Sequence, residues 1–382
     1  MYSFSNDKQE QLRQKIRTFA QEVIAPEAGR LDEEERFSTG LTKKMGEMGL
    51  LGMTAPKQYG GQGFDTLSYI IAVEELSRVD SSQAATVVAH NSLGLVPIID
   101  YGTEAQKEKY LPKLTGGDHL WAFGLTEENA GSDARGTETT AIHENDHWII
   151  NGSKRYITNA STPITLGVTL QVMTQNDTSS QPKLTTILVE KGTSGFHAER
   201  MLGKMMWRAA DTARITLKNC RVPYSNLLGE EGQGARYMLR TLDGGRLSVA
   251  AMGLGLAQGA FEMALKHAKT RKQFGKPIGR NQAIAFKLSD MDMKLELARN
   301  TLYRACMLKD HGQPFSKEAA MAKLYTSEIA REIADEAVQI FGGAGLFKNN
   351  PIERFYRDQR LLQIGEGTSE ILRLVIARNL GV

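Results

Sequence analysis

Apolar residues recur every three or four positions through the first third of the chain, which is the spacing of amphipathic helices. Leu12, Ile16, Phe19 and Val23 would share one face of a first helix, and the polar residues 5–7 can cap it. The same spacing predicts further helices over residues 69–79, 84–99 and 103–114. The pattern therefore predicts an N-terminal helical domain over residues 1–120.

The spacing of apolar residues shortens between residues 121 and 228. Here β-branched residues become frequent, and turn residues separate short apolar runs. Asn151-Gly152 directly follows the apolar run 148–150 and predicts a tight hairpin turn. Other strand-like runs cover residues 164–173, 184–189 and 213–217. We therefore expect a middle β domain, antiparallel and barrel-like, over residues 121–228.

Long helical patterns return after residue 229 and predict a C-terminal four-helix bundle over residues 229–382. The stretch 247–261 is the most apolar of the chain, but it is too short to span a bilayer and is rich in small residues, so it should pack inside the bundle. Together the three regions predict a multidomain α+β fold. Its bundle helices are expected over residues 232–267, 284–311 and 316–342, with a short final helix from Thr368.

Composition narrows the possible functions of this chain of 382 residues. Its net charge is only +3 and its charges are interspersed, so neither nucleic acid nor a membrane surface is an expected partner. The acidic pair Glu74-Glu75 is expected on the outer face of its helix. Cys220 and Cys306 do not suit a disulfide scaffold, and residues 1–7 resemble no secretory signal, so we expect a reducing, cytoplasmic setting.

Two motifs that could indicate other chemistry are better explained by local structure. His143 and His147 fit the H-E-x-x-H pattern of zinc proteases, but that pattern needs a helix and Asn145-Asp146 predicts a turn here. No metal site is therefore expected. Glycines 253, 255 and 259 do not follow a strand, so they suit close helix packing better than dinucleotide binding.

The strongest chemical signal is a set of motifs in a fixed order. Glu366 stands between two glycines just before the last expected helix, where a flexible turn lets a carboxylate reach into a cleft. Taken alone it would suit a solvated acid at a helix start. The other motifs are a loop of glycine and hydroxyl residues at 123–132 and the segments 154–160, 271–275 and 339–345. Over nearly the whole chain, these motifs resemble the signatures of the acyl-CoA dehydrogenase family.

The resemblance implies FAD as the cofactor. Tyr156 would cover one face of the flavin ring, and Thr158 would hydrogen-bond near its N5 atom; most relatives carry Trp where Tyr156 stands. A second group of residues would bind the adenosine and pyrophosphate of FAD, largely from a neighbouring subunit, with an arginine and backbone N–H groups beside the phosphates. The glycine run at 342–345 also suits a helix end. The implied cofactor-binding residues are Phe123, Leu125, Thr126, Ser132, Tyr156, Ile157, Thr158, Arg271, Gln273, Phe274, Gln282, Gln339, Gly342, Gly343, Thr368, Ser369 and Glu370.

The resemblance also implies α,β-dehydrogenation of an acyl-CoA thioester to the trans-2-enoyl-CoA. Glu366 would take the α-proton and flavin N5 the β-hydride. Burial under the substrate and the flavin would raise the pKa of Glu366 toward a useful range. The implied substrate-binding residues are Ser132, Asp243, Arg246 and Gly367.

Three positions bear on the acyl group that the resemblance implies. Some branched-chain relatives carry the base where Gly245 stands, so the base of this chain is expected at Glu366 instead. Ala84 stands where glutaryl-CoA relatives have an arginine, which favours a monocarboxylic chain. Gly365 replaces a common tyrosine and would leave space for a short or branched acyl group.

An electron-transfer flavoprotein as electron acceptor and a homotetramer complete the expectation. Two alternatives stay open: a flavin-dependent oxidase or monooxygenase on the same fold, and a non-catalytic acyl-CoA-binding module. Retention of Glu366 favours dehydrogenation over the first, and the intact flavin motifs argue against the second.

Overall fold

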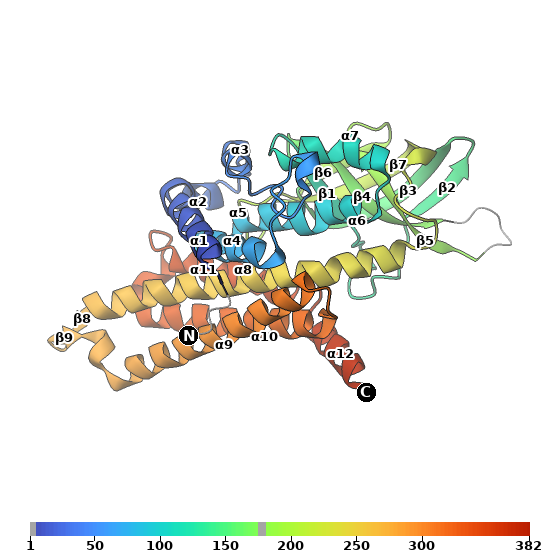
Figure 1. Cartoon of the computed structure of the whole chain (residues 1–382). Coiled ribbons are helices and arrows are strands. Elements are labelled where there is room, and N and C mark those ends of the chain that lie inside the picture. The colour runs from blue at the N-terminus through green and yellow to red at the C-terminus, as the bar shows by residue number, and fades with distance from the viewer. Residues whose placement is uncertain (1–4, 175–180) are drawn as a thin grey trace.

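The computed structural model describes residues 5–174 and 181–382. Residues 1–4, which belong to the segment considered above for a secretory signal, lie outside this part. The N-terminal helices and the β domain form one side of the molecule, and the long C-terminal helices form the other (Figure 1). This layering confirms the α+β class with helical, β and helical regions in chain order.

The N-terminal region is helical, as the apolar spacing predicts. Asn6 caps the first helix through a reciprocal bond with Gln9, and Ile16 and Phe19 are buried on its inner face. The segment expected as one helix over 84–99 is continuous but contains a π-helical stretch, Ala89–Leu95. The helices are α1 (Asp7–Phe19), α2 (Ala25–Glu33), α3 (Thr39–Glu47), α4 (Thr66–Ser77), α5 (Ser81–Val88), α6 (Val96–Tyr101) and α7 (Glu104–Thr115), with a second π segment at Ala20–Ile24.

The outward orientation expected for Glu74 and Glu75 is wrong, because both side chains are buried. Glu74 accepts hydrogen bonds from Arg299 and Tyr303, and Glu75 pairs with Arg17 at 2.8 Å. Burial alone would raise the pKa of Glu74, but Arg299 and Arg13 hold it below its ordinary value. The partners come from distant segments, so the sequence pattern around α4 could not reveal them.

The β domain is a mixed sheet rather than an antiparallel one. β4 runs parallel to β1 and, for two residues, to β2, while the other pairs are antiparallel. β1 and β6 were not expected, because each is short and β1 is buried along its whole length without alternation. The strands are β1 (Leu120–Gly124), β2 (Thr140–Glu144), β3 (His147–Thr158), β4 (Thr165–Thr174), β5 (Lys183–Glu190), β6 (Phe196–Arg200) and β7 (Thr212–Pro223).

The hairpin turn predicted at Asn151-Gly152 is also wrong. Both residues lie inside β3, and the turn that joins β2 to β3 is at Asn145-Asp146. Gly152 marks a register shift against β7, and a Cβ there would lie 2.6 Å from Oγ1 of Thr139. This glycine therefore serves a bulge and a close backbone approach rather than a turn. The turn between His143 and His147 is the one that excludes a zinc-binding helix.

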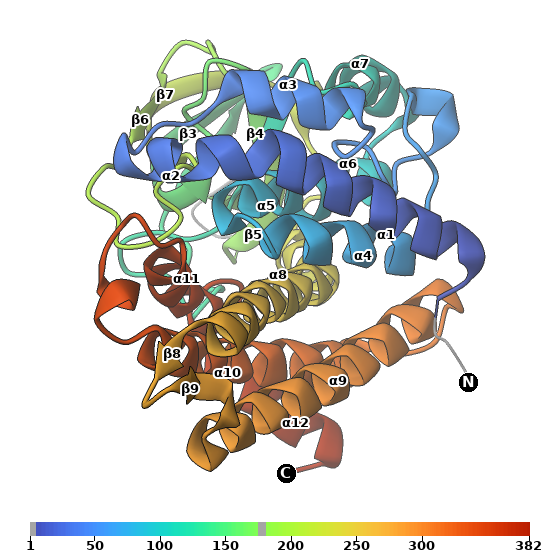
Figure 2. The same ribbon diagram turned by 90° about the vertical axis from the view of Figure 1, so that its left-hand side faces the viewer.

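The C-terminal helices are α8 (Gly234–Thr270), α9 (Gln282–Asp310), α10 (Ser316–Phe341), α11 (Ile352–Asp358) and α12 (Ser369–Leu380). α8 runs between the N-terminal helices and the pair α9 and α10 (Figure 2). A hairpin of β8 (Lys272–Gln273) and β9 (Lys276–Pro277) joins α8 to α9. α11 was not expected, since it is a single short stretch of seven residues.

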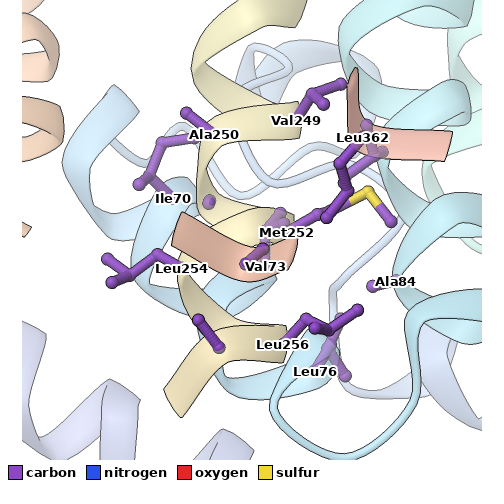
Figure 3. Packing of buried hydrophobic residues seen from close by; sticks show 14 of the residues in the cluster. Ile70, Val73, Leu76, Ala84, Val249, Ala250, Met252, Leu254, Leu256 and Leu362 are labelled. Carbon is purple, nitrogen blue, oxygen red and sulfur yellow. The ribbon is translucent and has the colours of Figure 1, made fainter. Parts of the chain in front are cut away.

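α8 is the central element of the core. Its Met252 and Leu256 lie beside Val73 and Leu76 of α4 (Figure 3). Gly255 is needed for this packing, since a Cβ there would lie 2.1 Å from the Glu74 carbonyl oxygen. In the described part of the chain α8 has the length and composition of a membrane span, but most of its apolar stretch is buried, as expected of a core helix.

Candidate active site

The turn that carries Glu366 connects a 3-10 segment, Gln359–Gln363, to α12. Glu366 has φ 53° and Gly367 has φ 103°, so the backbone reverses sharply between them. A left-handed conformation at a glutamate costs about 1–2 kcal/mol and persists only where surrounding contacts enforce it. Thr368 caps α12 by accepting a hydrogen bond from Ile371, which fixes the far side of the turn.

The Glu366 carboxyl group fills a space that Gly245 of α8 leaves open. A Cβ at Gly245 would lie 2.1 Å from Oε2 and 3.2 Å from Cδ of Glu366. Oε2 is buried and has no hydrogen-bond partner among the described residues. A buried carboxylate oxygen without a partner is costly, so it is available for a proton or a ligand.

Burial raises the pKa of Glu366 to about 7, although the nearby cations Lys323 and Arg246 oppose the shift. The Lys323 ammonium donates a hydrogen bond of 2.7 Å to the carbonyl oxygen of Gly367. Arg246 forms an ion pair with Asp243 one helical turn earlier. The site thus holds a carboxyl group that exchanges its proton near neutral pH, which is what general acid–base catalysis requires.

A cavity of about 340 Å³ adjoins the same stretch of α8. It is lined by Asp243, Gly244 and Ser248 of α8, by Tyr69 of α4, and by Ser92 and Phe315. The hydroxyl groups of Tyr69 and Ser248 are buried there without a hydrogen-bond partner among the described residues. A mixed cavity of this size beside a proton-exchanging carboxyl suits a small-molecule site.

The predicted loop at 123–132 follows β1 and is held in place by Lys154 of β3. Lys154 and Glu127 form a buried ion pair at 2.6 Å, and the Lys154 ammonium also donates to the Leu125 carbonyl. Glu127 accepts bonds from the backbone N–H groups of Glu138 and Thr139. Phe123 is nearly buried, Leu125 and Thr126 are half-buried, and Ser132 is exposed.

Tyr156 and Thr158 lie at the end of β3, where the pairing with β7 shifts register. Tyr156 has φ 62°, and its ring stays 58% exposed beside Arg155. Ile157 is buried instead, and Thr158 is half-buried. An exposed aromatic ring next to a pinned loop fits a flat ring system such as the isoalloxazine of FAD.

The second group of predicted cofactor residues lies elsewhere. Arg271, Gln273 and Phe274 belong to the β8–β9 hairpin at the tip of the bundle, away from the β domain (Figure 1). The ring stacking of His267 on Phe341 places the ends of α8 and α10 side by side, so the hairpin is close to the glycines after α10. The exposed residues of this group are Arg271, Gln273, Phe274 (95%), Gln282, Gln339, Gly342 and Gly343.

The three predicted residues after Glu366 differ in their surroundings. Thr368 is the cap of α12, Ser369 donates a hydrogen bond of 2.7 Å to Glu328, and Glu370 is exposed. Lys323 was not predicted as a site residue, because a lysine inside a helix gives no signal of its own. The 43 residues between Lys323 and Gly367 hide the contact of Lys323 with the turn that carries Glu366.

Comparisons with known proteins agree with this geometry. The N-terminal, middle and C-terminal domains of acyl-CoA dehydrogenase match residues 6–118, 122–220 and 232–381. A "Probable acyl-CoA dehydrogenase" of Bacillus subtilis is 47% identical over 98% of both chains. The structure of butyryl-CoA dehydrogenase from Megasphaera elsdenii is 39% identical, with a TM-score of 0.96 and full coverage of both chains.

A further solved structure was described under the name "Electron transferring flavoprotein of Acidaminococcus fermentans". Its matching chain is 42% identical, with a TM-score of 0.96 over 100% of this chain and 99% of that one. Similarity at this level over whole chains establishes both family and fold. The chain belongs to the acyl-CoA dehydrogenase family and is an FAD-dependent oxidoreductase that dehydrogenates acyl-CoA thioesters.

Proposed function

We propose that this enzyme converts short-chain or branched acyl-CoA thioesters to trans-2-enoyl-CoA, and that Glu366 removes the α-proton. The observation that carries the proposal is the Oε2 atom of Glu366, buried without a partner on a turn held in a left-handed conformation. The nearness of its pKa to neutral pH supports the role, because a base works best when its pKa is close to the operating pH.

The overall change removes one proton from Cα and one hydride from Cβ of the substrate. Bound FAD supplies the acceptor for the hydride. The chain's own task is to hold the α-carbon against Glu366, to exclude water and to stabilise charge on the thioester oxygen. The backbone N–H of Glu366 is a suitable donor to that oxygen by resemblance to the family, and closure of the substrate over Oε2 would raise the pKa of the carboxyl further.

The remaining substrate contacts are assigned by position. Asp243 lines the cavity and Arg246 is its ion-pair partner, which supports a contact between this pair and the polar arm of CoA. Gly367 is the glycine next to the base and leaves room for the thioester. Ser132 is exposed on the loop after β1 and would reach both the flavin and the substrate.

A short or branched acyl chain is supported by three features. Butyryl-CoA is the substrate named for the relative from Megasphaera elsdenii. Ala84 is buried on α5 and offers no charge to a distal carboxylate. At Gly365 a Cβ would meet Leu361 at 3.6 Å, an ordinary contact, so a side chain could be attached here without a clash at its first carbon.

We propose that FAD lies between two subunits of a homotetramer. The two groups of cofactor residues support this, since the second is exposed at the tip of the bundle, apart from Tyr156 and the loop at 123–132. The nearly free ring of Phe274 also suits burial against another chain. Light scattering of the FAD-saturated protein tests the assignment, and a monomer with full FAD content would rule it out.

The electron acceptor is proposed to be an electron-transfer flavoprotein, in line with the name of the structural relative from Acidaminococcus fermentans. A cytoplasmic location is supported by Cys220 and Cys306, which are both buried and unpaired. Oxygen consumption separates this assignment from the oxidase alternative, since an oxidase would use oxygen without any added acceptor.

The decisive experiment is anaerobic bleaching of the flavin absorbance by a panel of straight and branched acyl-CoAs. Glu366→Gln should keep FAD and bind acyl-CoA, but reduce the flavin at least ~10²–10⁴-fold more slowly. Glu144→Gln, an exposed glutamate of β2, is the matched control and should behave as the parent. Reduction by Glu366→Gln within about threefold of the parent rate would refute Glu366 as the base.

A further inference from the structure

Lys323 lies two turns into α10 and has no exposed surface. An ammonium group in such a position is costly unless nearby groups compensate its charge. The structure gives it one hydrogen bond, of 2.7 Å, to the carbonyl oxygen of Gly367. Lys323 forms no salt bridge within 4.0 Å with any carboxylate of residues 5–174 and 181–382. The turn that carries the base is therefore its main partner.

The surroundings of Lys323 are organised around Glu366. Burial lowers the pKa of Lys323 to about 8, and the negative charge of Glu366 is the largest influence that counteracts this. Arg246 of α8 disfavours the charge on Lys323, while Glu328 of α10 and Glu370 of α12 favour it. The buried cation and the buried carboxyl thus stabilise each other's charged forms.

The two cations near Glu366, Arg246 and Lys323, have different interaction partners. Arg246 is engaged with Asp243, which also accepts a hydrogen bond from Ser316. Lys323 contacts the backbone of the catalytic turn itself, one residue after Glu366. Gly367 has φ 103°, a conformation that places its carbonyl oxygen toward α10 and that the hydrogen bond helps to hold. Removing Lys323 would leave this partly buried carbonyl without its partner.

We infer that Lys323 is a positioning residue for the proton transfer: its ammonium group fixes the turn at Gly367 and favours the ionised form of Glu366, which accepts the α-proton. This inference rests on the proposed function of Glu366. Its physical content is twofold. The hydrogen bond restricts where the carboxylate lies, and the charge counteracts the burial that would otherwise leave Glu366 protonated at neutral pH.

The predicted pH dependence follows from the sign of this interaction. A base must be ionised to act, so the rate of flavin reduction should rise with pH through the pKa that Glu366 has beside the bound substrate, which lies above its value of about 7 in the free protein. Without the charge of Lys323 that pKa rises, and the increase of the reduction rate with pH should occur about one pH unit higher. The other titratable or charged groups facing the pair are Tyr69 from α4, Arg246 and Asp243 from α8, Glu328 from α10 and Glu370 from α12. Burial holds the pKa of Tyr69 well above this range.

The test compares Lys323→Gln, Lys323→Met and Lys323→Arg, each as the FAD-loaded enzyme. Gln keeps an N–H donor for Gly367 without the charge, Met removes both, and Arg keeps the charge. Lys15→Met, an exposed lysine of α1, is the control. The readouts are the rate of anaerobic flavin reduction by butyryl-CoA across pH, the Kd of butyryl-CoA and the FAD content.

Lys323→Gln and Lys323→Met should both retain FAD, and in both the rise of the reduction rate should occur about one pH unit higher than in the parent. At neutral pH the rate should be roughly 10-fold lower for Lys323→Gln and lower still for Lys323→Met. Lys323→Arg should keep the pH dependence of the reduction rate close to that of the parent. If Met does not fold, Gln decides the question. If Lys323→Gln had the reduction rate and the pH dependence of the parent, the inference would be overturned, even where Glu366→Gln abolishes reduction. Reduction that survives Glu366→Gln would instead overturn the proposed function.

Discussion

The contact between Gly245 and Glu366 permits a sharp test, because a single methyl group at position 245 would occupy the place of the carboxyl. In the structure a Cβ at Gly245 lies 2.1 Å from Oε2 of Glu366, whereas real Cβ atoms essentially never approach other atoms within 3.0 Å. Gly245→Ala must therefore displace the carboxyl oxygen by 0.9 Å or more. Leu93, at 3.2 Å from the same Cβ, limits escape on that side.

The displacement should reduce catalysis without reducing stability. A misplacement of about 1 Å can cost roughly 10²-fold in rate, because the reacting atoms leave their productive geometry. Position 245 lies inside α8, where alanine favours the helix over glycine by ~0.5–1 kcal/mol. We therefore expect slower flavin reduction in a protein that is as stable as the parent, which separates this effect from ordinary unfolding.

The assay is stopped-flow flavin reduction at saturating butyryl-CoA, together with thermal unfolding of the same samples. Gly40→Ala is the matched control, since a Cβ at this helical glycine of α3 would meet only Ser38, at 3.9 Å. It should keep the parent rate. If Gly245→Ala reduced its flavin as fast as the control while remaining folded, the carboxyl would not occupy the space beside Gly245 during catalysis.

Three further outcomes are expected. Lys154→Met should destabilise the protein by ~3–5 kcal/mol in denaturant unfolding and weaken FAD binding in a titration, because Glu127 would stay buried without its ion pair; an FAD affinity equal to that of the parent would contradict this. Burial and the nearby Asp80 raise the pKa of Asp358 to about 7, above its unfolded value of ~3.9, so its stabilising contribution is complete below about pH 4 and is lost as pH rises through 7. Asp358→Asn, which keeps an acceptor for the Trp207 N–H, should flatten the pH dependence of the free energy of unfolding, and an unchanged curve would oppose this. Gly365→Tyr should change the ratio of kcat/KM for branched against straight acyl-CoAs by roughly 10–200-fold, whereas an equal loss for both would show that residue 365 does not line the acyl pocket.

Much of the architecture was predictable because it depends on local periodicity. The spacing of Ile16 and Phe19 predicted a helix with a buried face, and both residues are buried in α1. The small residues of 247–261 predicted close packing, and Gly255 indeed lies against the backbone of α4. Where a pattern was ambiguous the prediction failed: Asn151-Gly152 has the composition of a turn, but pairing with β7 keeps it inside a strand.

The candidate site was predictable only as a set of motifs. Order and spacing along the chain identified Glu366, Tyr156 and the loop at 123–132, because the resemblance to one family depends on sequence alone. The sequence could not say that Oε2 of Glu366 is buried, which decides between a solvated acid and a carboxyl whose pKa is raised to about 7. Burial is a property of the packed chain, and no residue near Glu366 in the sequence produces it.

The sequence by itself therefore determined the helical and β regions and the family motifs, since these depend on neighbours within a few residues or on the order of short segments. Tertiary structure alone decided which charges are compensated. Glu74 meets Arg299, Lys154 meets Glu127, and Lys323 meets the turn of Glu366 across gaps that local patterns do not span. The energy of a buried charge depends on the distance to its partners and on the exclusion of water, and both exist only in the folded protein.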